Sequence, residues 1–469
     1  MNLATIDLVS PGAGFRVDSS RGGRTADSYG TENFGEITIA LKMYDTQAPP
    51  PEAALLIGLD RPGTDRWAAN DSLDELRELA ESAGVSVLDK LTQKRDAPSA
   101  PTFVGKGKVA EIAALCQKLA ANTVIFDDDL SPAQGRNLGE ILGPTIKVID
   151  RTELILDIFA QRARTREGKI QVELAQLEYM LPRLTGMWTH LSRQRAGVGA
   201  RGPGETQLET DRRHVQEKIT RLQRQLEEVR KNRRIERSGR EKLHWPRVSI
   251  IGYTNSGKST LMNKLTDAGV LAEDKLFATL DPTTRKHRLP NNQNILLSDT
   301  VGFLRKLPHH LVESFKATLE ETTEADLLLH VVDVTHPQVH EQIAAVNVVL
   351  HDLDAGMKPV VVALNKIDRI GEDRSVVERL QREHSGSVEI SAKCGTNLDV
   401  LQDEIALRLS DRRVSVTLSI PADRQQAIAL VYRAGYVTAR EHEAGRVILR
   451  AQIPRVMAGE LKPYVISEE

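Results

Sequence analysis

Near the middle of the chain the sequence reads Gly252-Tyr253-Thr254-Asn255-Ser256-Gly257-Lys258-Ser259, and Thr260 follows. The apolar residues 248–251 before this loop predict a strand, and residues 259–265 after it predict a helix. A glycine-rich turn from a strand into a helix aims backbone N–H groups at one point, where an anionic phosphate can bind. In such a loop Lys258 would reach the β- and γ-phosphates of a nucleotide, and the Ser259 hydroxyl would bind Mg²⁺.

A second motif, Asp299-Thr300-Val301-Gly302, follows the apolar residues 295–297. An Asp at the carboxyl end of a strand beside the phosphate loop can hold a water of the Mg²⁺ shell. Gly302 can offer its backbone N–H to a γ-phosphate, so that loss of this phosphate releases the loop behind it. Asp and Gly end many strands, so the motif counts here because of its position after the phosphate loop.

A third motif, Asn365-Lys366-Ile367-Asp368, follows an expected strand at 360–364. A buried carboxylate at 368 can accept hydrogen bonds from N1–H and the N2 amine of guanine, and adenine lacks both donors. The stem of Lys366 can lie over the base, and Ser391-Ala392-Lys393 can support the O6 side. The alternative is a capping Asn–Asp turn before a helix, which the two preceding motifs disfavour. The sequence therefore predicts a GTP site and disfavours ATP.

Between the first two motifs the chain reads Phe277-Ala278-Thr279-Leu280-Asp281-Pro282-Thr283-Thr284. One threonine is expected to close over Mg²⁺ and the γ-phosphate, but spacing does not choose among Thr279, Thr283 and Thr284. Phe303 follows Gly302, where Ras-like enzymes place a glutamine that orients water. An apolar ring cannot polarise water, so we expect slow hydrolysis by the isolated protein and acceleration by a partner.

The composition suits a cytoplasmic protein of about three domains. Two cysteines, Cys116 and Cys394, exclude a disulfide scaffold. No apolar run approaches the roughly 20 residues of a membrane span, and the N-terminus lacks a signal-peptide core. We expect a monomer, with peripheral association with a membrane surface left open.

The net charge of −2 conceals a basic segment. Residues 162–247 contain 21 Lys and Arg against 11 Asp and Glu, a balance of +10, so the rest carries −12. Such a block indicates a polyanionic partner, with nucleic acid as the leading candidate. The alternative is a solvated helical face of mixed charge.

Two apolar stripes in this segment predict an antiparallel helical hairpin. Their members are Ile170, Leu174, Leu177 and Leu181, and then Val215, Ile219, Leu222, Leu226 and Val229. Between them lies a glycine-rich run, 195–204, which would form a cationic tip. Arg195 and Arg201 in the run, and Arg212 and Arg213 after it, are candidates for contact with RNA phosphates. The alternative is a flexible loop without a ligand.

Alternating strand and helix patterns predict the domain organisation. We expect a disordered arm at 1–35, an α/β domain at 36–160, the hairpin at 161–244, a P-loop GTPase domain with a doubly wound sheet at 245–410, and a small α+β domain at 411–469. The turn Gly105-Lys106-Gly107-Lys108 opens a helix, and we interpret it as structural or as an RNA contact. A second nucleotide site there is the less favoured reading.

Taken together, these residues resemble the HflX family of GTPases. The resemblance is carried by Gly199-Ala200-Arg201-Gly202-Pro203-Gly204-Glu205-Thr206-Gln207-Leu208-Glu209 with Asp211-Arg212-Arg213, by the Phe277–Asp281 run, and by the phosphate-loop and DxxG motifs. It extends from about residue 55 to about residue 409.

The resemblance implies a Mg²⁺-dependent GTPase that binds the large ribosomal subunit and acts in ribosome splitting and rescue under stress. It implies that the N-terminal domain, the hairpin and the glycine-rich loop approach ribosomal RNA. By the family pattern Thr279 binds Mg²⁺ alongside Ser259. Together with the motifs, this predicts that Asp299 binds Mg²⁺ through water and that Lys258, Thr279 and Gly302 are the catalytic residues. The alternative is a GTP-gated RNA or membrane-surface scaffold, in which hydrolysis only resets affinity.

Overall fold

The computed structural model describes residues 52–61, 69–184, 203–241, 245–266, 276–277, 279–306, 316–410, 413–443, 445–454, 457, 459 and 461–468. The predicted arm at 1–35 lies outside the described residues, and so do Ala278, Arg195 and Arg201.

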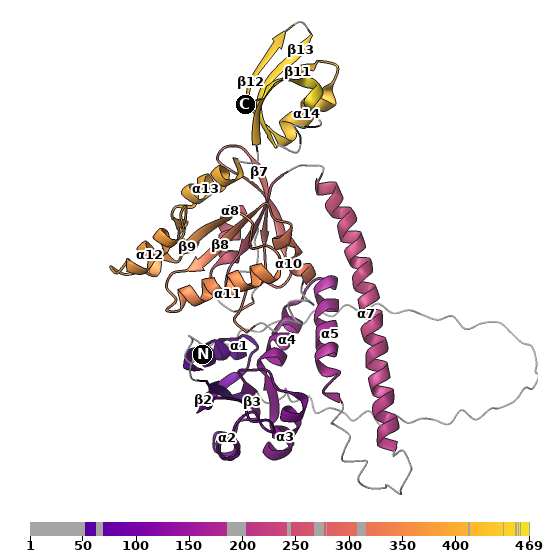
Figure 1. Cartoon of the computed structure of the whole chain (residues 1–469), viewed down its shortest axis with the longest axis vertical. Coiled ribbons are helices and arrows are strands. Elements are labelled where there is room, and N and C mark those ends of the chain that lie inside the picture. Colours follow the sequence, from indigo (N-terminus) through magenta and orange to yellow (C-terminus); the bar gives the residue numbers. More distant parts are fainter. Residues whose placement is uncertain are drawn as a thin grey trace, which may run out of the picture. The chain divides into compact units, whose positions relative to one another are not determined.

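The N-terminal unit is a parallel four-stranded sheet in the order β2-β1-β3-β4 with helices on both faces (Figure 1). Side chains of the central strand β1 alternate between two cores. Ala54 and Leu56 pack with α1 and α4, whereas Leu55 and Ile57 pack with α2 and α3. The elements are β1 (Ala53–Asp60), α1 (Ala69–Ser82), β2 (Ser86–Lys94), α2 (Lys106–Leu119), β3 (Thr123–Phe126), α3 (Pro132–Leu142), β4 (Lys147–Asp150) and α4 (Arg151–Arg162).

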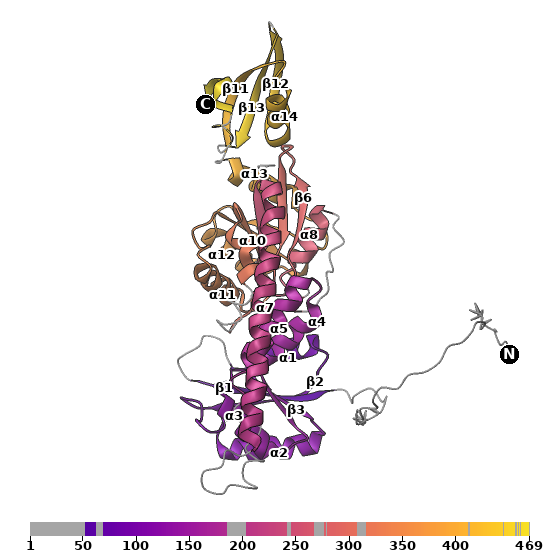
Figure 2. The same ribbon diagram turned by 90° about the vertical axis from the view of Figure 1, so that its right-hand side faces the viewer.

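The predicted helical hairpin is confirmed, and it consists of α5 (Arg166–Met180) and α7 (Pro203–Glu241). Figures 1 and 2 both draw the two helices side by side. Their interface is one cluster made by the two predicted stripes, with Ile170, Leu174, Ile219, Leu222 and Leu226 buried and the remaining stripe residues at its margin. Despite its length of 39 residues, α7 is too polar to span a bilayer, and no other described helix is long and apolar enough to do so.

The P-loop unit is a doubly wound six-stranded sheet in the order β10-β9-β8-β5-β7-β6, as predicted. Its strands are parallel except for the edge strand β6. Helices α8 and α13 cover one face, and α10, α11 and α12 cover the other. The elements are β5 (Arg247–Ile251), α8 (Lys258–Thr266), β6 (Thr283–Arg288), β7 (Asn294–Asp299), α10 (Lys316–Thr323), β8 (Leu327–Asp333), α11 (Val339–Asp352), β9 (Val360–Asn365), the 3-10 helix η2 (Ile367–Arg369), α12 (Ser375–Glu383), β10 (Val388–Glu389) and α13 (Leu398–Ser410).

The C-terminal unit is an antiparallel sheet in the order β12-β13-β11-β14, and helix α14 packs against it. Its elements are β11 (Arg413–Pro421), α14 (Gln425–Ala434), β12 (Tyr436–Glu443), β13 (Arg446–Pro454), η3 (Lys462–Tyr464) and β14 (Val465–Glu468).

Candidate nucleotide-binding site

The phosphate loop, residues 252–259, connects β5 to α8 at the carboxyl edge of the sheet. Two of its glycines are required by geometry. Gly252 has φ +147°, and a Cβ there would lie 2.3 Å from the carbonyl oxygen of Val331. Gly257 has φ +97°, and a Cβ there would lie 2.3 Å from the side-chain nitrogen of Asn365. The loop therefore keeps its tight curvature only with glycine at both positions.

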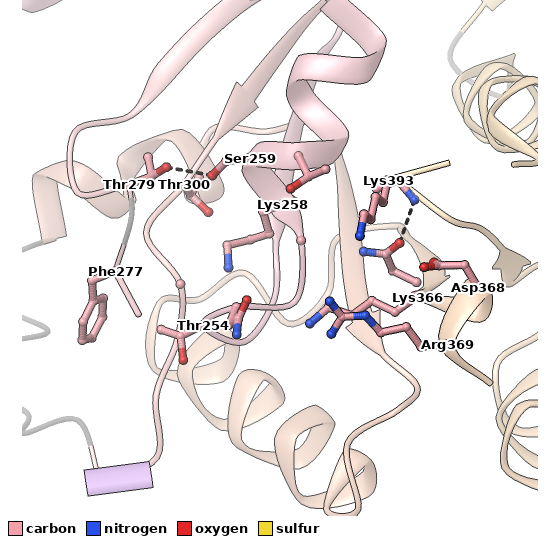
Figure 3. A pocket seen from close by; sticks show the side chains of 16 residues that line it. Thr254, Lys258, Ser259, Phe277, Thr279, Thr300, Lys366, Asp368, Arg369 and Lys393 are labelled. Atoms are coloured by element: carbon pink, nitrogen blue, oxygen red, sulfur yellow. Dashed lines mark hydrogen bonds between the residues drawn. The ribbon is translucent and has the colours of Figure 1, made fainter. Parts of the chain in front are cut away.

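Lys258, the first residue of α8, extends its amine into the cavity that the loop encloses (Figure 3). Its Nζ donates to the carbonyl oxygens of Tyr253 at 2.6 Å and Gly252 at 3.2 Å. Burial lowers the pKa of Lys258 to about 8, and Lys366 acts in the same direction, while Asp299 opposes both. The amine is a desolvated cation held only by neutral carbonyl groups and a distant carboxylate, so an anionic phosphate would stabilise its charge.

Three oxygen-bearing side chains converge beside Lys258. The Ser259 hydroxyl donates to Asp299 Oδ2 at 2.7 Å, Thr279 Oγ1 donates to the same oxygen at 3.0 Å, and the two hydroxyls lie 2.8 Å apart. Asp299 is completely buried, burial raises its pKa, and its Oδ1 has no hydrogen-bond partner among the residues that the structure describes. A buried carboxylate oxygen without a partner, next to two hydroxyls, fits a hard divalent cation such as Mg²⁺.

At the other end of the cavity, Asn365 ties two loops together. Its Nδ2 donates to the Ser256 carbonyl at 2.8 Å, and its Oδ1 accepts from the Ala392 amide at 2.9 Å. Ser391 Oγ donates to Asp368 Oδ1 at 2.6 Å, which orients that carboxylate. The motif at 365–368 and the Ser391–Lys393 turn are therefore held against the phosphate loop.

Lys366 lies between these parts in the left-handed conformation, with φ +70°. Its Nζ pairs with Asp333 Oδ2 at 2.7 Å, at the end of β8. This ion pair fixes the stem of Lys366 at the cavity wall, where Figure 3 draws it next to Asp368 and Arg369.

The cavity has a volume of about 270 Å³ and collects most of the predicted contact residues. Its lining is Thr254, Asn255, Gly257, Lys258, Ser259, Thr260, Phe277, Thr279, Thr300, Gly302, Asn365, Lys366, Asp368, Arg369, Ala392 and Lys393. Sequence reasoning did not anticipate Arg369, which directly follows the third motif. The sequence also predicts a buried Asp368, whereas its side chain is exposed, because this side of the cavity is open and a bound base would itself provide the cover.

Of the predicted contact residues that the structure describes, nine do not line the cavity: Gly252, Tyr253, Ser256, Leu280, Asp281, Asp299, Val301, Ile367 and Ser391. Several act from behind it, as Asp299 and Ser391 do through the hydrogen bonds above. Tyr253 and Asp281 are different, because their side chains turn toward residues far away in the sequence.

The Tyr253 hydroxyl donates a short hydrogen bond to Glu75 of α1 and accepts one from the Arg305 amide at 2.9 Å. Glu75 in turn pairs with Arg151 at 2.6 Å, and Arg151 also pairs with Asp127 at 2.8 Å. Arg151 has 2 % of its surface exposed, and the two carboxylates hold the pKa of Arg151 above its usual value despite its burial. This network joins the phosphate loop to the N-terminal unit, and no motif in the sequence signals it.

Phe303 lies behind the cavity and has 2 % of its surface exposed. Its carbonyl accepts from the Thr254 amide at 2.9 Å, and its own amide donates to the Gly252 carbonyl at 3.1 Å. The segment that follows the second motif is thus paired with the phosphate loop, and the ring belongs to the apolar core. The side chain of Phe303 is not in a position to contact a water molecule in the cavity.

Of the four arginines predicted to contact RNA, the structure describes Arg212 and Arg213, and both are exposed on α7. Arg213 lies 3.8 Å from Glu217, and 69% of its side chain is exposed to solvent. Both positions are compatible with contact to an external polyanion.

Comparison with known proteins assigns four consecutive family models to the chain. They are described as GTP-binding GTPase N-terminal for residues 70–160, GTP-binding GTPase Middle Region for 162–240, 50S ribosome-binding GTPase for 247–366, and HflX C-terminal domain for 375–465. The GTPase HflX of Lacrimispora saccharolytica is 47% identical over 398 residues, which cover 85% of this chain and 93% of that protein.

The GTPase HflX of Escherichia coli K12 is 46% identical over 387 residues, 82% of this chain and 90% of that protein. Among solved structures, a GTP-binding protein from Sulfolobus solfataricus in complex with GDP is 26% identical and covers 77% of this chain and 99% of its own length, with a TM-score of 0.41.

Proposed function

Because the chain belongs to the HflX family of GTPases, we propose that it is a Mg²⁺-dependent GTP hydrolase that binds the large ribosomal subunit and uses GTP to split or rescue ribosomes under stress. The observation that carries this proposal is a cavity lined at one end by Lys258 of the phosphate loop. Its other end is lined by Asp368, a carboxylate that can accept hydrogen bonds from guanine. We further propose that it acts in the cytoplasm as a monomer associated with ribosomes, with the domain boundaries expected from the sequence.

In this proposal Lys258 and the backbone amides of the phosphate loop bind the β- and γ-phosphates, and the Gly302 amide binds the γ-phosphate. Ser259 and Thr279 hold Mg²⁺ directly, and Asp299 holds it through water. Mg²⁺ would neutralise the charge that develops on the phosphate oxygens during transfer. The support is the oxygen cluster itself, in which Asp299 Oδ2 accepts from both hydroxyls while Oδ1 has no hydrogen-bond partner within the described part of the chain.

Thr279 can be distinguished experimentally from the other threonines of its segment. We expect Thr279→Ala to raise the Mg²⁺ concentration needed for half-maximal GTP hydrolysis by roughly tenfold, since one ligand is lost. Thr284→Ala is the matched control, because its hydroxyl contacts Ser298 at 2.9 Å and does not line the cavity. Equal Mg²⁺ requirements in both variants and the parent would contradict the assignment.

We propose that the ribosome helps to orient the water molecule that attacks the γ-phosphate. Phe303 is buried behind the phosphate loop, so the residue that follows Gly302 presents no polar side chain to orient the attacking water. We therefore expect hydrolysis to be slow alone and to rise by at least tenfold when large subunits are added, as for other GTPases that are completed by a partner. Rapid hydrolysis that large subunits do not change would remove this part of the proposal.

The hairpin is proposed to supply the RNA contacts, through Arg212 and Arg213 and through Arg195 and Arg201 near its tip. The rival function, a GTP-gated scaffold, shares the cavity and the hairpin, and it differs only in its effect on ribosomes. Under that alternative the protein binds without separating the subunits.

A further inference from the structure

The first switch segment, Phe277–Asp281, ends in a carboxylate that binds the base of the hairpin. Asp281 Oδ2 accepts from the backbone amides of Arg164 and Thr165, both at 2.8 Å, and Oδ1 accepts from the Thr165 hydroxyl at 2.5 Å. Thr165 is the N-cap of α5, and its Oγ1 accepts from the Gly168 amide at 3.0 Å. Asp281 therefore completes the cap of the helix that begins the hairpin.

The first turn of α5 packs closely around the Asp281 carboxylate. A Cβ at position 168 would lie 2.5 Å from Asp281 Oδ1, so the first turn of α5 can approach the carboxylate only because Gly168 has no side chain. Three hydrogen bonds thus join two segments more than a hundred residues apart in the sequence, and a fourth, within the first turn of α5, meets them at Thr165 Oγ1. Such a contact is specific to one position of the switch relative to α5.

The other end of the same segment is anchored to the neighbouring helix. The ring of Phe277 packs edge-on against Phe159 of α4, with centroids 4.6 Å apart and an interplanar angle of 75°. Phe277 also lines the nucleotide cavity. Thr279 lies between the two anchors, two residues from each, and its hydroxyl is 3.0 Å from Asp299 Oδ2.

We propose that Asp281 is a positioning residue that couples the occupancy of the γ-phosphate site to the helical hairpin. The inference rests on the proposed function, because it takes Thr279 as the residue that closes over Mg²⁺ and the γ-phosphate. Closure of Thr279 places Asp281 on the cap of α5, and the buried stripe between α5 and α7 transmits that position to the hairpin. Opening of the segment after hydrolysis withdraws the carboxylate and leaves two backbone amides and a hydroxyl of the α4–α5 corner without their acceptor.

A merely structural cap would behave differently. It would hold α5 equally in every nucleotide state, and its removal would only destabilise the helix. A coupling residue must instead make the helix cap depend on whether GTP or GDP is bound, since a ligand shifts an equilibrium only through a difference in affinity for its two states. The two roles are therefore distinguished by whether the cap of α5 is more stable with a GTP analogue bound than with GDP bound.

Hydrogen exchange of the Arg164 and Thr165 amides in the full-length protein measures this quantity directly. With Mg²⁺ and a non-hydrolysable GTP analogue we expect exchange in the parent to be slower by roughly tenfold than with GDP, because hydrogen bonds to a carboxylate are among the stronger ones. Asp281→Asn should remove most of this difference, and Thr165→Ser, which keeps the hydroxyl, should retain it. Asp403→Asn, an exposed carboxylate on α13, is the control for loss of one negative charge.

Equal exchange with both nucleotides in the parent would overturn the inference, as would an unchanged difference in Asp281→Asn. If Asp281→Asn does not fold, Gly168→Ala, whose Cβ would lie 2.5 Å from Asp281 Oδ1, displaces the carboxylate and is read in the same way. The measurement needs no ribosome. A failure of this inference can therefore be distinguished from a failure of the proposed activity on ribosomes. The affinity for the large subunit is then measured with the GTP analogue and with GDP. We expect the ratio of these two affinities to fall toward one in Asp281→Asn. A ratio equal to that of the parent would contradict the coupling.

Discussion

In the proposed function, Asp368 is the residue that selects the base. One of its oxygens is oriented by Ser391 at 2.6 Å, and the side chain is open to the cavity. Replacing it by Asn presents an amide donor to the N1–H and N2 donors of guanine. We expect GTP affinity to fall by roughly 100-fold, since two hydrogen bonds to a charged group are lost, and xanthosine triphosphate to become the preferred ligand.

Equilibrium binding of fluorescent GTP and xanthosine triphosphate checks this prediction. Asp373→Asn is a matched control, because this exposed carboxylate lies five residues further on and contacts the Ser375 amide, outside the cavity lining. A variant at 368 that binds both nucleotides as the parent does would show that the base has been placed in the wrong part of the cavity.

Lys258 makes the unfolding free energy of the nucleotide-free protein vary with pH in the alkaline range. Burial lowers the pKa of Lys258 in the folded protein to about 8, below the usual lysine pKa of 10.5, so between these two pH values the unfolded chain binds more protons than the folded chain. The unfolding free energy therefore gains a contribution as pH rises from 8 to 10.5, amounting to about 3 kcal/mol, and loses it as pH falls back. Lys258→Met lacks this contribution.

Denaturant unfolding of the parent and of Lys258→Met at several pH values tests the sign. The difference in unfolding free energy between the two proteins should change in favour of the parent as pH increases across that window. Parallel pH profiles would mean that the amine is not desolvated in the nucleotide-free state.

The sequence predicts where the cavity lies, because each motif directly follows a strand of a parallel sheet. The carboxyl ends of such strands lie at the same edge of the sheet. This reasoning brings Lys258, Thr279 and Asp368 together correctly. Spacing does not determine which way a side chain turns. Tyr253 and Asp281 stand inside two motifs, yet their side chains contact residues in the N-terminal unit and at the start of α5, which only the tertiary structure identifies.

At the scale of elements, the hairpin helix α7 presents Arg212 and Arg213 to solvent. Replacing Arg212 and Arg213 together by Gln should weaken large-subunit binding and reduce the slope of log K against log salt by about 1.5, since each phosphate contact releases less than one counterion. The charge-matched control is Arg379→Gln with Arg382→Gln, two exposed arginines on α12. Binding titrations at several salt concentrations measure both, and an equal loss of slope in the two double variants would contradict a specific role for the hairpin.

The elements that were easiest to predict carry a strong apolar period. The two stripes of the hairpin repeat every three or four residues, and all of them lie in one cluster. The edge strand β6 was not predicted, because all six of its residues, Thr283–Arg288, are polar. A strand that pairs with a neighbour on one side only and faces solvent does not need an apolar pattern, so backbone pairing with β7 defines it.

At the scale of the whole molecule, buried charges hold the N-terminal unit against the P-loop unit. Burial would raise the pKa of Asp127, but Arg151 and Lys306 together hold that pKa below its usual value. Arg151 also donates to the Arg305 carbonyl at 3.3 Å, so it touches both units. We expect Arg151→Met to cost about 3–5 kcal/mol, because Glu75 and Asp127 lose their shared partner.

Calorimetry of the full chain checks this expectation. The two units should unfold in one transition in the parent and in two in Arg151→Met, whereas Arg77→Met, on the exposed side of α1, should behave as the parent. A single transition in all three proteins would show that the apolar part of the interface alone couples the units.

The most direct test of the proposed activity is light scattering of intact ribosomes mixed with the protein. With GTP or its non-hydrolysable analogue, and not with GDP or ATP, the account predicts a fall in scattering as the subunits separate, and no fall with Asp368→Asn. Ribosomes that bind the protein with GTP and keep their full scattering would contradict it.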